Sequence, residues 1–325
     1  MLIAQLSDLH LRAAPPAGAR VAACRTWGVE SENRPQRVQF APDSPPHSPA
    51  MGPEDGAKWA AAVDLQPTLP KSDRLPDTTA LLRACVQDLC ARQPAPDLLL
   101  LSGDLSDSGS AADYALLRQL VQPLRALGVP ILPLVGNHDR RAALRHACAD
   151  WLQACQRLHP TFVQYVWHCP KLRLVALDTV AEGSAHGELC AERLRWLEQA
   201  LAASPLPTLL LLHHPPYATG LAEMDGMALR QGAAELEALL WQHPQVQALL
   251  CGHLHRLTVT QVAHALAISA PSTAHQIALD LRPDQPARYR LEPPGYLLHR
   301  WHGGRLLTHT VVVGDFGAAQ DFDSL

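Results

Sequence analysis

The segment "ILPLVGNHDRR" (residues 131–141) passes directly from an apolar run into a cluster of polar groups. Residues 131–135 are typical of a buried β-strand, and this pattern breaks at Gly136. An Asn-His-Asp triplet at 137–139 follows without any spacer. A buried strand that ends in three adjacent polar side chains indicates that the strand end serves a function rather than packing.

Five further apolar runs have the length of a buried strand, at 2–8, 97–104, 172–178, 208–214 and 246–253. Helical patterns lie between most of the six runs, at 78–92, 111–128, 190–203 and 233–244. Strands that alternate with helices predict an α/β fold whose parallel strands are buried on both faces. Beyond residue 256 the segments are shorter and alternating, which indicates antiparallel strands that complete the sheets.

Five of the six predicted strands end in side chains that can bind a metal ion. These side chains are Asp8 and His10, Asp104, Asn137 and His138, His213 and His214, and His253 and His255. The C-terminal ends of parallel strands lie along one edge of a sheet, so five separate stretches deliver oxygen and nitrogen ligands to one place. Only the strand that ends at Asp178 lacks a motif of this kind.

The type and number of these ligands indicate two metal ions. The candidate ligands contain no thiolate and are Asp8, His10, Asp104, Asn137, His213, His253 and His255. They are too many for one ordinary site, and mixed imidazole and carboxylate ligation favours Mn, Fe, Co or Zn over Mg or Ca. Two ions about 3.5–4 Å apart can activate a water and stabilise an in-line displacement at phosphorus. Glycines at 103, 136 and 252 are expected to allow sharp backbone turns at the crowded strand ends.

Composition restricts the partners and the compartment. The net charge is -4, and lysine occurs only at Lys58, Lys71 and Lys171, so no nucleic-acid partner is expected. The eight cysteines contain no C-x-x-C pair and are interpreted as reduced thiols of a cytosolic protein. The apolar runs fall short of the roughly 20 residues of a membrane helix. We therefore expect a soluble cytoplasmic protein without a membrane partner, and the sequence leaves a homo-oligomer open.

Residues 13–75 do not fit the α/β pattern. They are rich in proline, as in "PDSPPHSP" (42–49), and have little periodicity. The composition favours a mobile insertion beside the domain, and a lid over the site is the alternative. We therefore predict a single domain over residues 1–315, interrupted at about 13–75 and followed by a tail at 316–325.

The ordered set "DLH", "GDLSDSG", "GNHD", "HH" and "GHLH" resembles the calcineurin-like metallophosphoesterase superfamily over residues 2–255, apart from the insertion. Downstream segments such as "LAEMDGMALRQGAAELEALL" and "SAPSTAHQ" resemble its bacterial cyclic-nucleotide and glycerophosphodiester phosphodiesterase branch, to about residue 301. The resemblance implies a calcineurin-like four-layer α/β/β/α sandwich, in which two packed mixed sheets are flanked by helices.

The resemblance also implies a role for each matching residue. Asp104 would bridge two divalent transition-metal ions, the first held by Asp8, His10 and His255 and the second by Asn137, His213 and His253. His214 would lie next to the ligand His213 without binding a metal ion itself.

The same resemblance implies catalytic and substrate-binding residues. His138 matches the histidine that contacts the phosphate and serves the leaving group. Asp107 is expected to pair with His138, and a simple turn residue is the alternative reading of Asp107. Asn137, His138 and His275 are expected to contact the substrate.

These features predict a dimetal-dependent phosphodiesterase that acts on a small diester through a hydroxide that bridges the two ions. The expected substrate is a 3',5'-cyclic nucleotide such as cyclic AMP, or a glycerophosphodiester. Ser/Thr protein phosphatases of the superfamily have an Arg where this chain has Val135, which argues against a protein phosphatase and disfavours a monoesterase. The alternatives are a phosphomonoesterase of the superfamily and a non-catalytic scaffold that binds a partner, although every ligand position is intact.

Overall fold

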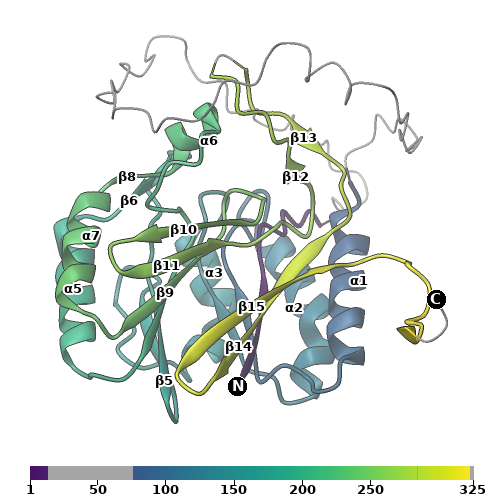
Figure 1. The fold of residues 1–325 in the computed structure, drawn as a ribbon, viewed down its shortest axis with the longest axis horizontal. Helices are drawn as coiled ribbons and strands as arrows, with labels where there is room; N and C mark the ends of the chain where they lie inside the picture. The colour runs from purple at the N-terminus through teal and green to yellow at the C-terminus, as the bar shows by residue number, and fades with distance from the viewer. Residues whose placement is uncertain (14–75, 284, 323–325) are drawn as a thin grey trace, which may run out of the picture. The chain divides into compact units, whose positions relative to one another are not determined.

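Two mixed β-sheets form the centre of the fold in a computed structural model that describes residues 1–13, 76–283 and 285–322 (Figure 1). The first sheet has the strand order β15-β14-β1-β2-β3. Its parallel strands are β1 (Leu2–Leu6), β2 (Leu98–Leu101) and β3 (Ile131–Pro133). The antiparallel strands β14 (Gly295–His302) and β15 (Arg305–Val312) extend the sheet on the other side of β1.

The second sheet has the order β10-β11-β9-β7-β5-β4. Its parallel strands are β5 (Leu172–Ala176), β7 (Thr208–Leu212), β9 (Val246–Cys251) and β11 (Ala265–Ser269). The antiparallel strands β4 (Tyr165–Cys169) and β10 (Thr258–Val262) form the two edges of this sheet. Two small ribbons pair β6 (Gly187–Glu188) with β8 (Leu229–Gln231) and β12 (Gln276–Ile277) with β13 (Tyr289–Arg290).

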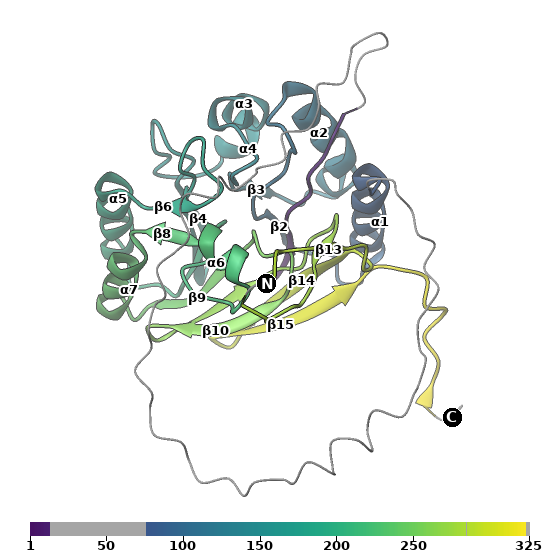
Figure 2. The same cartoon turned by 90° about the horizontal axis from the view of Figure 1, so that it is seen from above.

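Helices cover the outer faces of the two sheets. The helices α1 (Thr78–Ala91) and α2 (Ala111–Ala126) lie on the side opposite to α5 (Ala191–Ala202) and α7 (Ala233–Gln242) in both views (Figures 1 and 2). Buried side chains of β7 alternate between the two faces of the second sheet. Leu209 and Leu211 belong to the core shared with the first sheet, whereas Leu210 packs with α5 and α7. The predicted four-layer α/β/β/α arrangement is therefore confirmed.

The six predicted strands and four predicted helices are all present, but several strands end earlier than the sequence indicates. The strand β2 stops at Leu101, three residues before the predicted end, because Gly103 and Asp104 have φ angles of 97° and 50°. A strand cannot continue through left-handed residues. The structure also contains three short helices that the periodicity did not predict, namely α3 (Arg141–Ala147), α4 (Ala149–Leu152) and α6 (Ala222–Met227).

The predicted insertion at 13–75 lies outside the described residues apart from Ala13, and the predicted domain boundaries stay a prediction. The described residues all belong to one compact unit. The chain on either side of residues 14–75 is held together, since the Thr78 hydroxyl donates to the His10 carbonyl at 3.2 Å and the Ala13 N–H donates to Asp113 at 2.8 Å. Among the helices that the structure describes, none is long and apolar enough to cross a membrane.

Candidate metal centre

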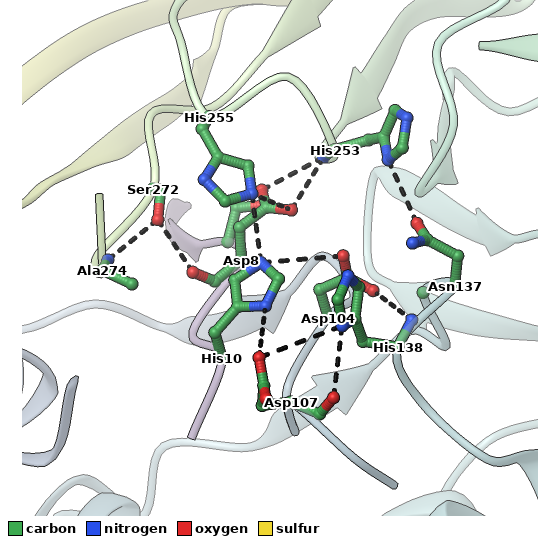
Figure 3. A network of polar contacts seen from close by, with 12 residues as sticks. Asp8, His10, Asp104, Asp107, Asn137, His138, His253, His255, Ser272 and Ala274 are labelled. Carbon is green, nitrogen blue, oxygen red and sulfur yellow. Dashed lines mark hydrogen bonds and ion pairs between the residues drawn. The ribbon is translucent and has the colours of Figure 1, made fainter. Parts of the chain in front are cut away.

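The seven predicted ligands lie together at the C-terminal ends of five strands, and most of them are seen in Figure 3. The first sheet supplies Asp8 and His10 after β1, Asp104 after β2 and Asn137 after β3. The second sheet supplies His213 after β7, and His253 and His255 after β9. All of these side chains are buried except that of Asn137, which is half-buried. The centre is therefore built by both sheets together.

The backbone of the ligands has an uncommon conformation. Seven non-glycine residues of the described ranges have a positive φ, and five of them are ligands: Asp8 (52°), His10 (43°), Asp104 (50°), His253 (71°) and His255 (49°). Non-glycine residues adopt this region at a cost, and such residues cluster at functional sites. The fold therefore holds these five residues in strained positions from which their side chains converge.

The first group of donor atoms surrounds one point between β1 and β9. The Nε2 atoms of His10 and His255 face each other at 3.1 Å. The Nε2 of His255 lies 3.5 Å from Asp8 Oδ1, and the Nε2 of His10 lies 3.7 Å from Asp104 Oδ2. Asp8, His10 and His255 form one of the clusters in which the ligand atoms are all close enough to hold a metal ion.

The second group surrounds the side-chain oxygen of Asn137. This oxygen lies 3.1 Å from His213 Nε2 and 3.1 Å from His253 Nδ1 (the second contact is drawn in Figure 3). The Nε2 of His213 also lies 3.4 Å from Asp104 Oδ2. The same oxygen of Asp104 thus faces a histidine of each group, which is the position of a carboxylate that bridges two ions.

These spacings fit a dinuclear centre. Bonds of about 2.0–2.1 Å place neighbouring donors of a tetrahedral or octahedral ion roughly 3.0–3.4 Å apart. Four of the donor contacts described above lie between 3.1 and 3.4 Å, and the two others are 3.5 and 3.7 Å. A set of imidazole, carboxylate and amide donors without a thiolate suits first-row transition metals. The residues present therefore fit two divalent ions.

Hydrogen bonds behind the histidines turn the free ring nitrogens toward the centre. The Nδ1–H of His213 donates to the Ser102 carbonyl at 2.9 Å, and the Nδ1–H of His255 donates to the His275 carbonyl at 2.9 Å. Each bond keeps the proton of the neutral ring on Nδ1, so Nε2 is the nitrogen available to a metal ion. The Asp8 carboxylate is fixed as well, because it accepts the His253 N–H at 3.0 and 3.1 Å.

The electrostatics of the centre attract positive charge. Burial raises the pKa of Asp8 to about 6 and lowers the pKa of His253 to about 3. Burial would also raise the pKa of Asp104, but the neighbouring His213 and His138 hold it well below its usual value. Burial alone would lower the pKa of His213, but the negative charge of Asp104 raises it to about 9. A proton is therefore held where a metal cation would replace it.

The chain turns sharply at all three glycines of the strand ends, as predicted. Gly103 turns with a left-handed φ of 97°. At the other two, the Asp139 N–H donates to the Gly136 carbonyl at 3.1 Å and the Leu254 N–H donates to the Gly252 carbonyl at 2.8 Å, with φ angles outside the left-handed region. Gly136 and Gly252 also allow close approach, because a Cβ at Gly136 would lie 2.3 Å from the Asp104 N and Oδ1, and one at Gly252 would lie 2.5 Å from Ser7 Oγ.

His138, Asp107 and His275 lie around the opening of the centre. The Nδ1–H of His138 donates to the Asp107 backbone carbonyl at 3.2 Å, while the Asp107 carboxylate is 4.0 Å from this nitrogen. That carboxylate lies 3.6 Å from His10 Nδ1 (Figure 3). It also forms an ion pair with Arg12 Nε at 2.8 Å. Burial opposes the charged form, yet His10 and Arg12 lower the pKa of Asp107 to about 2. The ring of His275 is 4.5 Å from that of His255.

Two buried aspartates organise the loops that carry these residues. Asp139 accepts the backbone N–H groups of Gly136, Leu105 and Ser106, and so ties the loop after β2 to the loop after β3. Asp139 is the last residue of the "GNHD" motif, and the sequence pattern predicted no role for it. Asp178, at the end of the strand without a motif, accepts two bonds from Arg141 at 2.7 and 2.9 Å, so its carboxylate is engaged in an ion pair.

His214 lies behind the ligands. Its Nε2–H donates to the Ala185 carbonyl at 3.2 Å, and its Nδ1 contacts the Thr179 hydroxyl at 2.8 Å. Both ring nitrogens are therefore engaged away from the centre. His213 Nε2, in contrast, faces Asp104 at 3.4 Å and Asn137 at 3.1 Å, and its role as the ligand in place of His214 stays a prediction.

Residues 1–257 match the family described as calcineurin-like phosphoesterase. The chain belongs to this family. The family predicted from the ordered motifs is therefore confirmed. Because the matched residues include all seven candidate ligands, the family assignment and the geometry of the centre refer to the same part of the chain.

Among similar proteins, a probable glycerophosphodiester phosphodiesterase GpdQ of Arcobacter nitrofigilis is 35% identical over 250 residues, covering 76% of this chain and 89% of the relative. A probable cyclic nucleotide phosphodiesterase of Synechococcus sp. is 36% identical over 231 residues, covering 68% and 85%. The crystal structure of a dimetal phosphatase from Danio rerio has a TM-score of 0.53 at 17% identity and covers 73% of this chain and 90% of that one. This structure supports the fold alone.

Proposed function

We propose that the chain is a metal-dependent phosphodiesterase that hydrolyses a small diester, either a 3',5'-cyclic nucleotide or a glycerophosphodiester. One observation carries the proposal. The same oxygen of Asp104 faces His10 at 3.7 Å and His213 at 3.4 Å, so one carboxylate joins two groups of ligands. Two relatives named as diesterases, at 35% and 36% identity, support the diester as the substrate class.

The proposed ions are two of Mn, Fe, Co or Zn, and the proposed location is the cytoplasm. Asp8, His10 and His255 would hold one ion, Asn137, His213 and His253 the other, and Asp104 both. When bound, such a pair supplies an activated water and polarises the phosphoryl oxygens of a diester.

His138 is the residue proposed to handle the proton of the leaving group. Its Nδ1–H is engaged by the Asp107 carbonyl, so Nε2 is the nitrogen left to face a substrate. Its ring contacts the ring of the ligand His10 edge-on at 4.7 Å, and its side chain is 27% exposed. A histidine that is both beside the ions and open to solvent can reach the leaving oxygen of a bound diester.

The rim of the centre favours a cyclic nucleotide over a glycerophosphodiester as the substrate. Tyr289 is 54% exposed, and its ring lies 5.3 Å from the ring of His275, which in turn contacts the ring of His255. An exposed aromatic ring at the mouth offers a face on which a base can stack, a contact worth about 1–3 kcal/mol. A glycerophosphodiester has no base and cannot gain this contact.

The proposed function is tested with metal-depleted protein that is reloaded with Mn²⁺. The substrates are cyclic AMP, cyclic GMP, glycerophosphocholine, bis-p-nitrophenyl phosphate and the monoester p-nitrophenyl phosphate. We expect two bound ions per chain and turnover of the diesters above that of the monoester. A preference for the monoester would indicate a phosphomonoesterase. Two bound ions without turnover of any ester would indicate a scaffold.

A variant pair tests the substrate class. Replacement of Tyr289 by Ala should lower kcat/KM for cyclic AMP about tenfold or more, because the stacking contact is lost. The same variant should leave kcat/KM for glycerophosphocholine unchanged. Tyr289→Phe keeps the aromatic face and is the matched control. Equal losses on both substrates would contradict a stacking role for Tyr289.

A further inference from the structure

A chain of polar side chains crosses the otherwise apolar core between the two sheets. It begins at Gln5 of β1, whose side chain is fully buried, and continues to His299 of β14, which is fully buried as well. Their strand neighbours Ala4, Leu6 and Leu298 belong to the largest apolar cluster among the described residues. Buried polar groups in such a place cost stability unless every one is hydrogen-bonded. The burial of Gln5 and His299 therefore calls for a structural or functional explanation.

The amide of Gln5 connects the two sheets. Its Nε2 donates to Ser102 Oγ at 2.9 Å, just after β2 of the first sheet. The same nitrogen donates to the Cys251 carbonyl at 2.8 Å, at the end of β9 of the second sheet. Ser102 and Cys251 each precede a proposed metal ligand, Asp104 and His253, by two residues.

His299 fixes the direction of this amide. The Nε2–H of His299 donates to Gln5 Oε1 at 2.9 Å, so the NH₂ group of Gln5 points toward Ser102 and Cys251. The Nδ1 of His299 accepts from the Thr308 hydroxyl of β15 at 2.9 Å. Both protons of the amide and both ring nitrogens are thus used in one consistent arrangement. Burial lowers the pKa of His299 to about 3, which agrees with a neutral ring.

The position of this bridge matters because each proposed ion takes ligands from both sheets. Asp8 and His10 of the first sheet face His255 of the second, and Asn137 of the first faces His213 and His253 of the second. Sheets pack at roughly 10 Å through side chains whose apolar contacts have no preferred direction. Metal ligands, in contrast, tolerate only about 0.2 Å of misplacement. Directional bonds between the sheets are a means to reach that accuracy.

We propose that Gln5, oriented by His299, is a positioning residue that sets the spacing between the metal ligands of the first sheet and those of the second. This inference rests on the proposed dimetal centre. Gln5 touches neither substrate nor metal and acts through the strand ends at Ser102 and Cys251. The ligands themselves stay intact when Gln5 is changed.

The test replaces the bridge by apolar side chains of similar size, Gln5→Met together with His299→Leu. The double variant leaves neither Ser102 nor Cys251 without a hydrogen bond. The Ser102 hydroxyl still donates to the Leu6 carbonyl, and the Cys251 carbonyl still accepts the Ala270 N–H. Apolar replacement of both partners of a buried polar pair is close to neutral for stability. We therefore expect the chelated variant to unfold at nearly the same temperature as the chelated wild type.

The readouts are metal affinity and the electron paramagnetic resonance of the Mn²⁺-loaded protein. Loss of a group that orients metal ligands weakens binding by about 10–100-fold. We expect a weakening of this size and a change from a coupled pair of ions to isolated ions. Wild-type metal affinity with an unchanged spectrum in the folded double variant would overturn the proposal. A wild type that binds no metal would refute the proposed function itself, so the two failures are distinguishable.

A milder variant covers the case in which the double variant does not fold. Thr308→Val removes only the hydroxyl that orients His299 and should weaken metal binding a few-fold. Thr310→Val changes an exposed threonine of the same strand and is the matched control, with wild-type affinity expected. Equal metal affinity of the two threonine variants would also overturn the proposal.

Discussion

Replacement of Gly136 by Ala adds one methyl group directly beside the proposed bridging ligand. The new Cβ would lie 2.3 Å from both the backbone nitrogen and Oδ1 of Asp104, and 2.9 Å from its Cγ. Real Cβ contacts essentially never fall below 3.0 Å, so the loop after β3 and Asp104 have to separate by at least 0.7 Å. The φ of Gly136 lies outside the left-handed region, so the effect of the substitution is steric alone.

This displacement exceeds what a dinuclear centre tolerates. Metal-ligand distances hold to about 0.2 Å, and a 1 Å misplacement of a catalytic group costs about 100-fold in rate. Overpacking itself destabilises a protein by about 1–3 kcal/mol. We therefore expect Gly136→Ala to remain folded, to bind the two ions more weakly and to lose about 100-fold in kcat on bis-p-nitrophenyl phosphate.

The assays are metal content after dialysis, steady-state kinetics with saturating Mn²⁺ and thermal unfolding of the chelated protein. Gly226→Ala is the matched control, because no heavy atom lies within 4 Å of its Cβ and Gly226 is in helix α6. The control should keep wild-type kinetics. A Gly136→Ala protein with wild-type metal content and kcat would refute the reasoning from close approach.

Two further predictions concern the centre, and a third concerns the buried His299. Asp104→Ala should lose both ions in metal analysis and His255→Ala mainly one, and an active Asp104→Ala protein with two bound ions would contradict a bridging carboxylate. His138→Ala, with its metal content intact, should slow diesters of poor alkoxide leaving groups far more than nitrophenyl esters, which need little acid; equal losses would leave His138 as a phosphate binder. The pKa of His299 is about 3 in the folded protein and about 6.5 in the unfolded chain. The stability contributed by the buried, neutral His299 is therefore complete above about pH 6.5 and is lost as the pH falls toward 3. Between pH 7.5 and 5 the wild type should therefore lose about 2 kcal/mol more of its free energy of unfolding than His299→Leu, and parallel curves in denaturant titrations would contradict this.

The arrangement of the strands and the place of the centre could be predicted because both are local in the sequence. Each apolar run has the length of one strand, and the metal-capable side chains follow within a few residues of its end, as in the segment that leads from β3 to Asn137. Parallel strands place such residues at one edge of the sheet. The positions of Asp8, His213 and His253 follow from the same rule.

The contacts that position these residues could not be predicted, because they join residues far apart in the chain. His299 donates to Gln5, 294 positions earlier, and a glutamine in a strand carries no signal of its own. Asp107 was expected beside His138, yet its carboxylate is closer to Arg12, at 2.8 Å against 4.0 Å. Whether Asp107 serves the leaving group stays a prediction. Sequence spacing places both residues on one loop edge, but the direction of a side chain depends on its tertiary neighbours.

The pairing of β1 with β14 has a consequence for how the protein is made. β1 pairs with β2 on one side and with β14 on the other, where Leu2 lies opposite Arg300. The ribosome synthesises β1 long before β14, so one edge of β1 stays open during most of translation. Open strand edges invite pairing with other chains, and contacts between distant residues form slowly. The strand that leads to Asp8 and His10 therefore keeps one unpaired edge until β14 has been synthesised, and until then this edge can pair with a strand of another chain.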